Sequence, residues 1–171
     1  TLTTNMGAET FYDYVKRFGF GEPTGIDLPY EAKGLVRLPG DGNWRDGDLG
    51  TNSFGQGIAV TPIQMITAVA AVANGGVLPK PYVVQRIEEN GRVVQEFHPQ
   101  PGRQVISPLV ARELSEMLAE IMRGKENLDI PGYTIAGKTG TAQIPVTGGY
   151  HPVDTIAAFV AYAPAQDPEF I

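Results

Sequence analysis

The first hydrophobic pattern along the chain predicts a helix over residues 8–18. Phe11, Tyr14, Val15 and Phe18 recur at intervals of three and four positions, which places them on one face of a helix. Glycines follow immediately and end the pattern, because glycine is a poor helix former. We therefore expect a helix that carries these four residues on one face.

A second helix is predicted over residues 62–73, and its start signal is unusually complete. Thr61 can cap the helix, Pro62 suits the first helical position, and Gln64 completes a capping box with Thr61. The residues up to Ala73 are apolar on nearly every side, so we expect this helix to be buried all round. The Asn-Gly-Gly sequence that follows ends it.

The third predicted helix follows a Ser-Pro start signal at positions 107 and 108, and a glycine at position 124 ends it. Its apolar residues recur at helical spacing. We expect the side that faces the core to consist of Leu109, Val110, Leu114, Met117, Leu118 and Ile121.

Alternating apolar and polar residues predict strands in the second half of the chain. An Asn-Gly pair lies between two such runs, 82–88 and 92–97, and this is the strongest short-range signal for a hairpin. Three more runs predict an antiparallel sheet: 133–144, 154–162 and a strand that starts at 169–171. Because the helices are segregated from this sheet, the predicted fold class is α+β.

Residues 22–57 carry many Gly, Pro and Asp residues and little periodicity, so they predict a long ordered loop. Within it, Ser53 and Gln56 are expected to form structural hydrogen bonds, since small polar residues commonly brace loops. The segment 144–153 should join two strands of the sheet; it either covers a cleft or is a passive connection.

Composition narrows the function classes. With 171 residues, of which 42% are hydrophobic, the chain can bury a core. A net charge of -6 argues against a nucleic-acid partner, and the absence of cysteine excludes disulfides and thiolate chemistry. No apolar run is long enough to span a bilayer, so any membrane anchor is expected outside this segment.

Two motifs overlap at Lys138. Residues 132–139 match the phosphate-binding pattern G-x-x-x-x-G-K-[ST], and the same lysine opens a Lys-Thr-Gly tripeptide. A phosphate-binding loop needs a strand before its first glycine and a helix after its lysine. Here a proline precedes the first glycine, and three glycines and a proline follow the lysine, so a strand is favoured over a nucleotide site.

On a strand, this tripeptide and the residue after it suit acyl transfer. Lys138 offers a fixed positive charge to a substrate carboxylate, and the hydroxyl of Thr139 can donate to it or relay a proton. Gly140 has no side chain, so a substrate backbone can approach the strand edge. The backbone N–H of Thr141 can act as one oxyanion donor.

Several blocks in the same order resemble the transpeptidase domain of monofunctional, class B-type penicillin-binding proteins. They are F-G-F-G at 18–21, T-G-I-D-L-P at 24–29, S-F-G-Q-G at 53–57, V-T-P-I-Q-M at 60–65, A-N-G-G at 73–76 and G-K-T-G-T-A-Q at 137–143. The resemblance implies the penicillin-binding and serine β-lactamase-like fold. It makes Lys138, Thr139, Gly140 and Thr141 catalytic, and Lys138, Thr139, Thr141 and Gln143 substrate-binding.

The resemblance also implies an activity. Such bacterial enzymes are D,D-transpeptidases, acyltransferases of peptidoglycan biosynthesis that acylate a serine with a stem peptide and then transfer the acyl group to an amine. β-Lactams acylate the same serine. The implied partners are stem peptides, β-lactams and other cell-wall synthesis proteins. The implied location is the outer face of the bacterial cytoplasmic membrane, with an N-terminal anchor and no cofactor.

The chain departs from the family because the nucleophile motif S-x-x-K is absent. Ser53, Ser107 and Ser115 are its only serines, and none has a lysine three residues on. The second motif, S-x-N, is missing too. We therefore expect residues 1–171 to be the C-terminal portion of a single transpeptidase domain, truncated at both ends, with the nucleophile upstream.

Two alternatives stay open from the sequence. A catalytically inactive scaffold module that kept the fold would also lack S-x-x-K, and the nucleotide-binding loop is the weaker of the two. His98 and His151 lie beside prolines without a partner at metal-ligand spacing, so we expect exposed loop histidines and no metal site.

Overall fold

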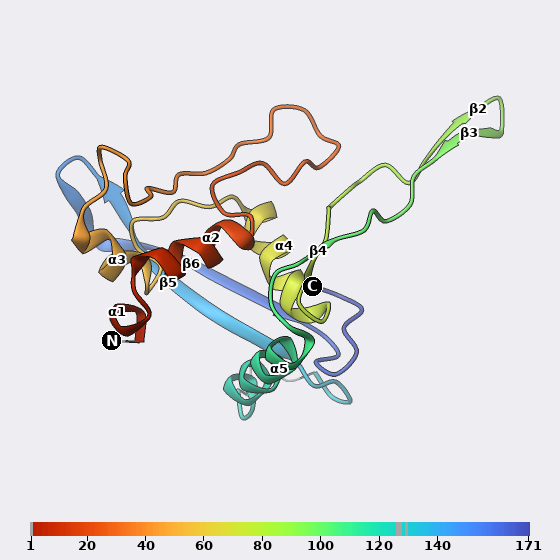
Figure 1. The fold of residues 1–171 in the computed structure, drawn as a ribbon. Helices are drawn as coiled ribbons and strands as arrows, with labels where there is room; N and C mark the ends of the chain where they lie inside the picture. The colour runs from red at the N-terminus through yellow and green to blue at the C-terminus, as the bar shows by residue number, and fades with distance from the viewer. Residues whose placement is uncertain (1, 126–127, 129) are drawn as a thin grey trace.

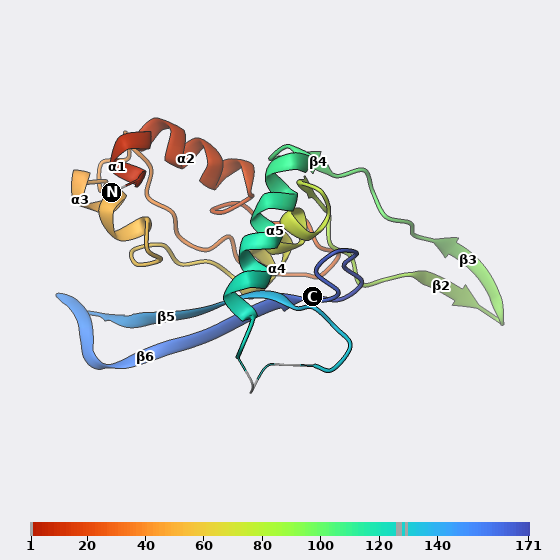
Figure 2. The ribbon, with the colours of Figure 1, turned by 90° about the horizontal axis from the view of Figure 1, so that it is seen from below.

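The computed structural model describes residues 2–125, 128 and 130–171 and has an α+β architecture. Figure 2 shows α2, α4 and α5 on one side of a long ribbon formed by β5 and β6, while the β2–β3 hairpin projects away from the rest. The elements, in chain order, are α1 Leu2–Met6, α2 Ala8–Arg17, α3 Asp46–Asn52, α4 Pro62–Ala73, β1 Val77–Leu78, β2 Arg86–Glu89, β3 Arg92–Glu96, β4 Arg103–Gln104, α5 Pro108–Met122, β5 Ala136–Val146 and β6 Gly149–Tyr162 (Figure 1).

Helix α2 forms where the periodicity predicts it. Tyr12 is its one buried residue, only 2% exposed, whereas Tyr14 is 39% exposed. The apolar periodicity did not single out Tyr12. The reason is that the Tyr12 hydroxyl has polar partners in the interior, which apolar periodicity does not record.

The start of α4 is confirmed in detail. The Thr61 hydroxyl accepts a hydrogen bond from the Gln64 N–H, and the Gln64 amide oxygen accepts one from the Thr61 N–H. The buried Gln64 also donates to the carbonyl oxygens of Glu22 and Lys33, at 2.7 and 2.9 Å, so it fixes the long loop to the helix. This second role follows from no sequence signal.

The prediction that α4 is buried all round is wrong for this structure. One face is covered, with Thr67, Ala68 and Ala71 buried, but Met65 and Ile66 are each 38% exposed. The described residues supply neighbours on the α5 side of the helix and leave its opposite face open.

Helix α5 begins and ends as predicted, with the Ser107 hydroxyl accepting from the Val110 N–H. Its predicted core face is largely wrong. Leu114 and Leu118 pack against the core, but the four other residues of that set are 41–61% exposed: Leu109, Val110, Met117 and Ile121. The packed face instead includes Ala111 and Met122, and the small side chain of Ala111 lets α5 approach its neighbours closely.

The helices pack in two small core clusters, and only the second of them includes residues of the β5–β6 ribbon. One joins Ala71 of α4 to Val105 and Ile106 before α5, and the other joins Ala136 of β5 to Tyr162 and Ala165 at the end of β6. The start of the K-T-G strand is therefore one of the best-buried places in the chain, since Ala136 is fully buried.

The hairpin and the sheet agree with the sequence in type. β2 and β3 pair across Asn90 and Gly91, both with positive φ, as a two-residue hairpin turn requires. β5 and β6 are antiparallel neighbours. The strand expected from residue 169 is reduced to a single bridge between Ala163 and Phe170. The long loop contains helix α3, which the Gly-rich sequence concealed.

Two carboxylates organise the loop between α2 and α4. The Asp27 carboxylate accepts from the N–H groups of Val83 and Val84, at 2.7 and 2.8 Å, and so joins the loop to the base of the hairpin. Glu31 accepts from the Thr24 N–H and hydroxyl and from the Gly25 N–H.

These bonds lower the pKa of both carboxyl groups. For Asp27 the hydrogen bonds from Val84 and Val83 lower the pKa from its ordinary value of 3.8. For Glu31 burial acts to raise the pKa from 4.5, but the hydrogen bonds from Thr24, Gly25 and Ile26 outweigh it, so the pKa is lowered. Hydrogen bonds that need the charged form favour that form.

We expect the two carboxylates to stabilise the fold above pH 4.5, and this gain to be lost as the pH falls below 3.8, because a carboxyl with a lowered folded-state pKa loses its contribution on protonation. The measurement is the melting temperature of the full-length protein and of a D27N/E31Q variant from pH 3 to 7. The two curves should separate at neutral pH and converge in acid. A Glu113→Gln variant on exposed α5 is the control and should follow the parent; curves that stay equally far apart at every pH would contradict the assignment.

Candidate active site

The Lys-Thr-Gly tripeptide lies in the first half of β5, where it pairs with the last third of β6. Lys138 is opposite Val160, Thr139 opposite Phe159, and Gly140 opposite Ala158. The strand continues past the lysine to Val146 without any helix. The local structure that a phosphate-binding loop requires is therefore not formed, and the nucleotide alternative lacks its geometric basis.

Only one edge of β5 is paired among the described residues, because the sheet consists of β5 and β6 alone. An unpaired strand edge presents N–H and C=O groups that can bind an extended peptide. Figure 2 shows β5 on the side of the ribbon nearer to α2 and α3. The question is which residues direct their backbone groups to the open edge.

Two contacts agree on that point. The Thr134 carbonyl accepts from the Ala165 N–H on the β6 side. The Thr139 carbonyl accepts from the Lys138 ammonium at 2.8 Å.

Odd-numbered residues of this stretch therefore direct their N–H and C=O groups to the open edge, because backbone direction alternates along a strand. Thr139 and Thr141 belong to this set, whereas Lys138, Gly140 and Ala142 pair with β6. The predicted oxyanion donor, the Thr141 N–H, is thus on the accessible edge.

The side chains of the predicted site are exposed. Lys138, Thr139, Thr141 and Gln143 are all solvent-accessible. Gln143 makes a long contact of 3.5 Å from its Nε2 to the His151 carbonyl oxygen. The four predicted substrate-binding residues therefore lie along one strand, and at about 3.4 Å per residue Lys138 and Gln143 are about 17 Å apart along it.

A hydrogen-bonded chain fixes the start of this strand to α5. The Tyr162 hydroxyl donates to Ser115 Oγ at 2.7 Å, and Ser115 Oγ donates to the Ala111 carbonyl oxygen at 2.9 Å. Burial raises the pKa of Tyr162, with the Ser115 contact acting in the opposite direction. Sequence reasoning missed this pair; a serine inside an apolar helical pattern was the available signal.

A second polar network joins α2 to α3. The Trp44 indole donates to the Tyr12 hydroxyl at 3.0 Å. The Asn52 amide makes the most hydrogen bonds in one orientation: its oxygen accepts from the Tyr12 hydroxyl, and its nitrogen donates to the carbonyl oxygens of Asp48 and Gln56. Ser53 donates to the Gly50 carbonyl oxygen, so its predicted bracing role is confirmed.

No serine of the chain is placed as an activated nucleophile. The Ser53 and Ser107 hydroxyls bond within their own helix or cap, and the Ser115 hydroxyl bonds to Ala111 and Tyr162. No lysine follows any of the three at the required spacing. In residues 2–125, 128 and 130–171 there is no His, Asp or Glu cluster that could hold a metal ion. His151 lies in β6, 3.4 Å from Asp154, rather than in a loop as predicted.

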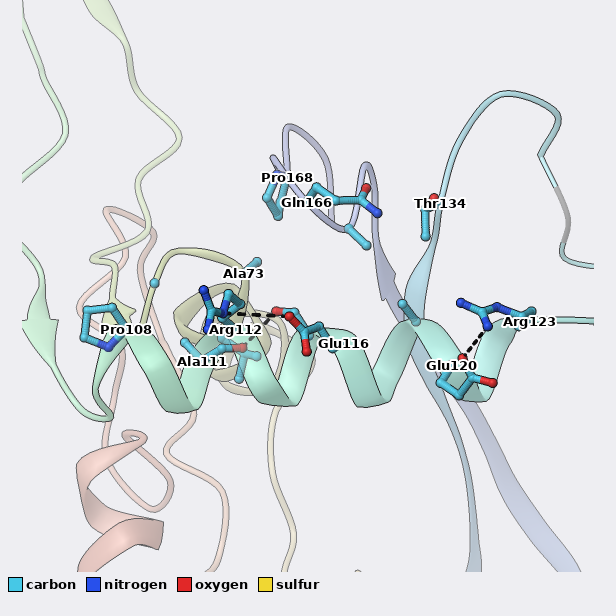
Figure 3. A pocket seen from close by; sticks show the side chains of 15 residues that line it. Ala73, Pro108, Ala111, Arg112, Glu116, Glu120, Arg123, Thr134, Gln166 and Pro168 are labelled. Atoms are coloured by element: carbon cyan, nitrogen blue, oxygen red, sulfur yellow. Dashed lines mark hydrogen bonds and ion pairs between the residues drawn. The ribbon is translucent and has the colours of Figure 1, made fainter.

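A cavity of about 510 Å³ lies away from the Lys-Thr-Gly tripeptide, between α5, the end of α4 and the turn after β6 (Figure 3). Arg112 and Arg123 line it and are paired with Glu116 and Glu120, at 3.7 and 2.8 Å. The candidate site is an open strand edge, not this cavity. Within the described ranges, no helix combines the length and hydrophobicity needed to cross a membrane.

Comparison with known proteins gives a consistent result. The family model described as penicillin binding protein transpeptidase domain matches residues 1–171. Stage V sporulation protein D of Bacillus subtilis is 36% identical over 99% of the chain, and the peptidoglycan D,D-transpeptidase FtsI of Escherichia coli is 30% identical over 99%. The chain spans 27% of the length of each of these curated relatives.

The fold is likewise similar to solved structures. Penicillin binding protein 3 of Mycobacterium tuberculosis, in a crystal structure with aztreonam, superposes with a TM-score of 0.87 at 30% identity. The superposition covers 99% of this chain and 40% of that one.

Proposed function

The chain belongs to the penicillin-binding protein transpeptidase family, and from this premise we propose that it supplies the K-T-G strand of a peptidoglycan D,D-transpeptidase. In this proposal residues 1–171 are the C-terminal portion of one transpeptidase domain. The serine nucleophile belongs to the preceding part of the same protein. The relatives named as D,D-transpeptidases support the activity, and because the chain spans only 27–28% of their length, this is a proposal about a larger protein.

The observation that carries the proposal is the open edge of β5. It offers a lysine charge, a threonine hydroxyl, a glycine without side chain and an outward N–H within four consecutive residues. An acyl-transfer site needs such groups: a counter-ion for the substrate carboxylate and a donor aimed at the developing oxyanion.

Each residue then has one role. Lys138 binds the carboxylate of the stem peptide or of a β-lactam, Thr139 donates a hydrogen bond to it, and Gln143 contacts the acyl donor further along the strand. The upstream serine attacks the penultimate carbonyl of the D-Ala-D-Ala stem and expels the terminal D-Ala. An amine of a second stem attacks the ester, forming the amide and freeing the serine, while the Thr141 N–H stabilises both oxyanions.

We place this protein at the outer face of the bacterial cytoplasmic membrane, held by an anchor outside this segment and acting with other cell-wall synthesis proteins. The support is the family and the cell-wall function in the relatives' names. β-Lactams are proposed as ligands because solved relatives carry them: penicillin binding protein 3 of Mycobacterium tuberculosis was crystallised with aztreonam and with ampicillin.

The test is covalent labelling by a fluorescent penicillin. The full-length protein should form a stoichiometric adduct on one upstream serine, identified by peptide mass spectrometry. The isolated 171-residue chain should form none, because it offers no activated hydroxyl. If the full-length protein is not labelled, the inactive-scaffold hypothesis replaces the proposal that it is an enzyme. A stable adduct on Ser53, Ser107 or Ser115 would contradict the proposal that the nucleophile lies upstream.

A further inference from the structure

A second cavity, of about 330 Å³, lies beneath the loop that follows α2. Its wall comes from distant parts of the chain: the end of α2, the following loop, one face of α4, the segment after β1, and the start of β4. None of the K-T-G strand residues lines it. It is therefore a separate site in the fold.

Three cationic side chains line this cavity, each from a different segment: Lys16, Lys80 and Arg103. None of them forms an ion pair with another described residue; the ion-paired arginines of the chain are elsewhere. Arg103 uses one donor to bond the Arg17 carbonyl oxygen at 2.7 Å, which caps the end of α2. Glu22 is the single carboxylate in the wall, so the cavity carries a net charge of about +2 in a chain of net charge -6.

A buried hydroxyl without a protein partner faces the same space. Thr67 on α4 is 6% exposed, it lines the cavity, and its hydroxyl forms no hydrogen bond with another described residue. Every fully enclosed side-chain oxygen or nitrogen among the described residues has a partner, so the Thr67 hydroxyl retains access to the cavity. A hydroxyl that is accessible and has no partner among the described residues is free to hydrogen-bond a ligand.

Gln64 beside it differs, because its amide is fully used by Glu22, Lys33 and Thr61. The wall of the cavity thus combines the satisfied Gln64 amide with three cations and one hydroxyl that has no hydrogen-bond partner among the described residues. Lys80 lies close over the loop: a Cβ atom at Gly25 would be 3.5 Å from its Cε.

From this arrangement we infer that the cavity binds a phosphate-bearing ligand, with the Thr67 hydroxyl donating at the floor and Lys16, Lys80 and Arg103 surrounding the anion. An arginine fork and two ammonium groups match the several oxygens and double charge of a phosphate. The space is larger than one phosphate group needs, so the rest of the ligand is uncharged or carries a second phosphate. The source is a soluble phosphate ester or a lipid headgroup.

The probe is inorganic pyrophosphate, titrated calorimetrically into the full-length protein at low salt. We expect saturable binding with a single site, weakened about tenfold by Lys80→Gln and by Arg103→Gln and about fivefold by Thr67→Val, because a charge-assisted bond exceeds a neutral one. Affinity should fall as NaCl is raised. Arg92→Gln, an exposed cation of β3 outside the cavity, is the matched control and should bind like the parent.

Penicillin labelling of each variant reports on the fold and on the proposed activity independently of the cavity. Variants that are labelled normally by penicillin but bind pyrophosphate more weakly support the inference. Absence of saturable binding to a protein that labels normally, or an equal loss in the Arg92→Gln control, would overturn it.

A flotation assay separates the two sources. Vesicles of phosphatidylglycerol or of phosphatidylcholine are mixed with the parent and with Thr67→Val; any anchor contributes equally to both proteins. If the parent binds phosphatidylglycerol vesicles more strongly than Thr67→Val does, the ligand is a lipid headgroup. If the parent binds pyrophosphate but shows no such difference on vesicles, the ligand is a soluble phosphate ester.

Discussion

Replacing Lys138 by alanine is expected to slow acylation of the full-length protein by penicillin about 100-fold, since a charge-assisted hydrogen bond to a carboxylate contributes roughly 1.5–3 kcal/mol. The melting temperature should stay nearly unchanged. Lys138 is exposed, and among the described residues its ammonium group hydrogen-bonds only to the neighbouring Thr139 carbonyl oxygen, so its removal leaves no cavity and no buried partner there. The measurement is the second-order acylation rate constant alongside the melting temperature.

Lys125→Ala is the matched control, because it removes an equally exposed lysine at the end of α5. It should acylate like the parent. If Lys138→Ala also acylates like the parent, Lys138 does not bind the carboxylate. If its melting temperature collapses instead, the lysine is structural and the assignment of the strand is wrong.

Replacing Thr141 by proline should slow acylation by about 10²–10³, the usual cost of losing one oxyanion donor. Proline removes the backbone N–H, whereas Thr141→Ala keeps it and should have only a mild effect. The strand should tolerate the proline, because the Thr141 N–H faces the open edge and takes no part in the pairing with β6.

The control for that geometry is the next residue. Ala142→Pro removes an N–H that pairs with β6, so it should lower the melting temperature clearly, since a proline inside a ladder deletes a hydrogen bond. The two prolines thus separate catalysis from stability at adjacent positions. A stable, inactive Ala142→Pro together with an active Thr141→Pro would reverse the assignment of the strand edges.

Local signals in the sequence predicted local structure well. The capping box of Thr61 and Gln64 and the turn at Asn90-Gly91 formed as expected, because both depend on residues within four positions. The faces of the helices were predicted poorly. Val110 and Met117 suit a core by composition, yet they are exposed, because the contacts of α5 depend on how closely its alanines approach α4 and β5.

The candidate site, too, could be predicted from the sequence only in part. Alternation and glycine content indicated that Lys138 lies on a strand and not before a helix, and the structure has that strand. No sequence signal said which backbone groups face outward, because this depends on pairing with residues 157–162. The Tyr162–Ser115 bond that fixes the strand to α5 was invisible for the same reason: its partners are 47 residues apart.

The β2–β3 hairpin is attached to the body chiefly at its base, where Asp27 holds Val83 and Val84, and all its strand residues are exposed (Figure 1). It shares no buried residue with either core cluster. We therefore expect the length and sequence of this hairpin to vary among related proteins without any effect on the acyl-transfer strand, as is usual for exposed loop tips. The same independence makes the Asn90-Gly91 turn the natural place to insert an epitope or a fluorophore.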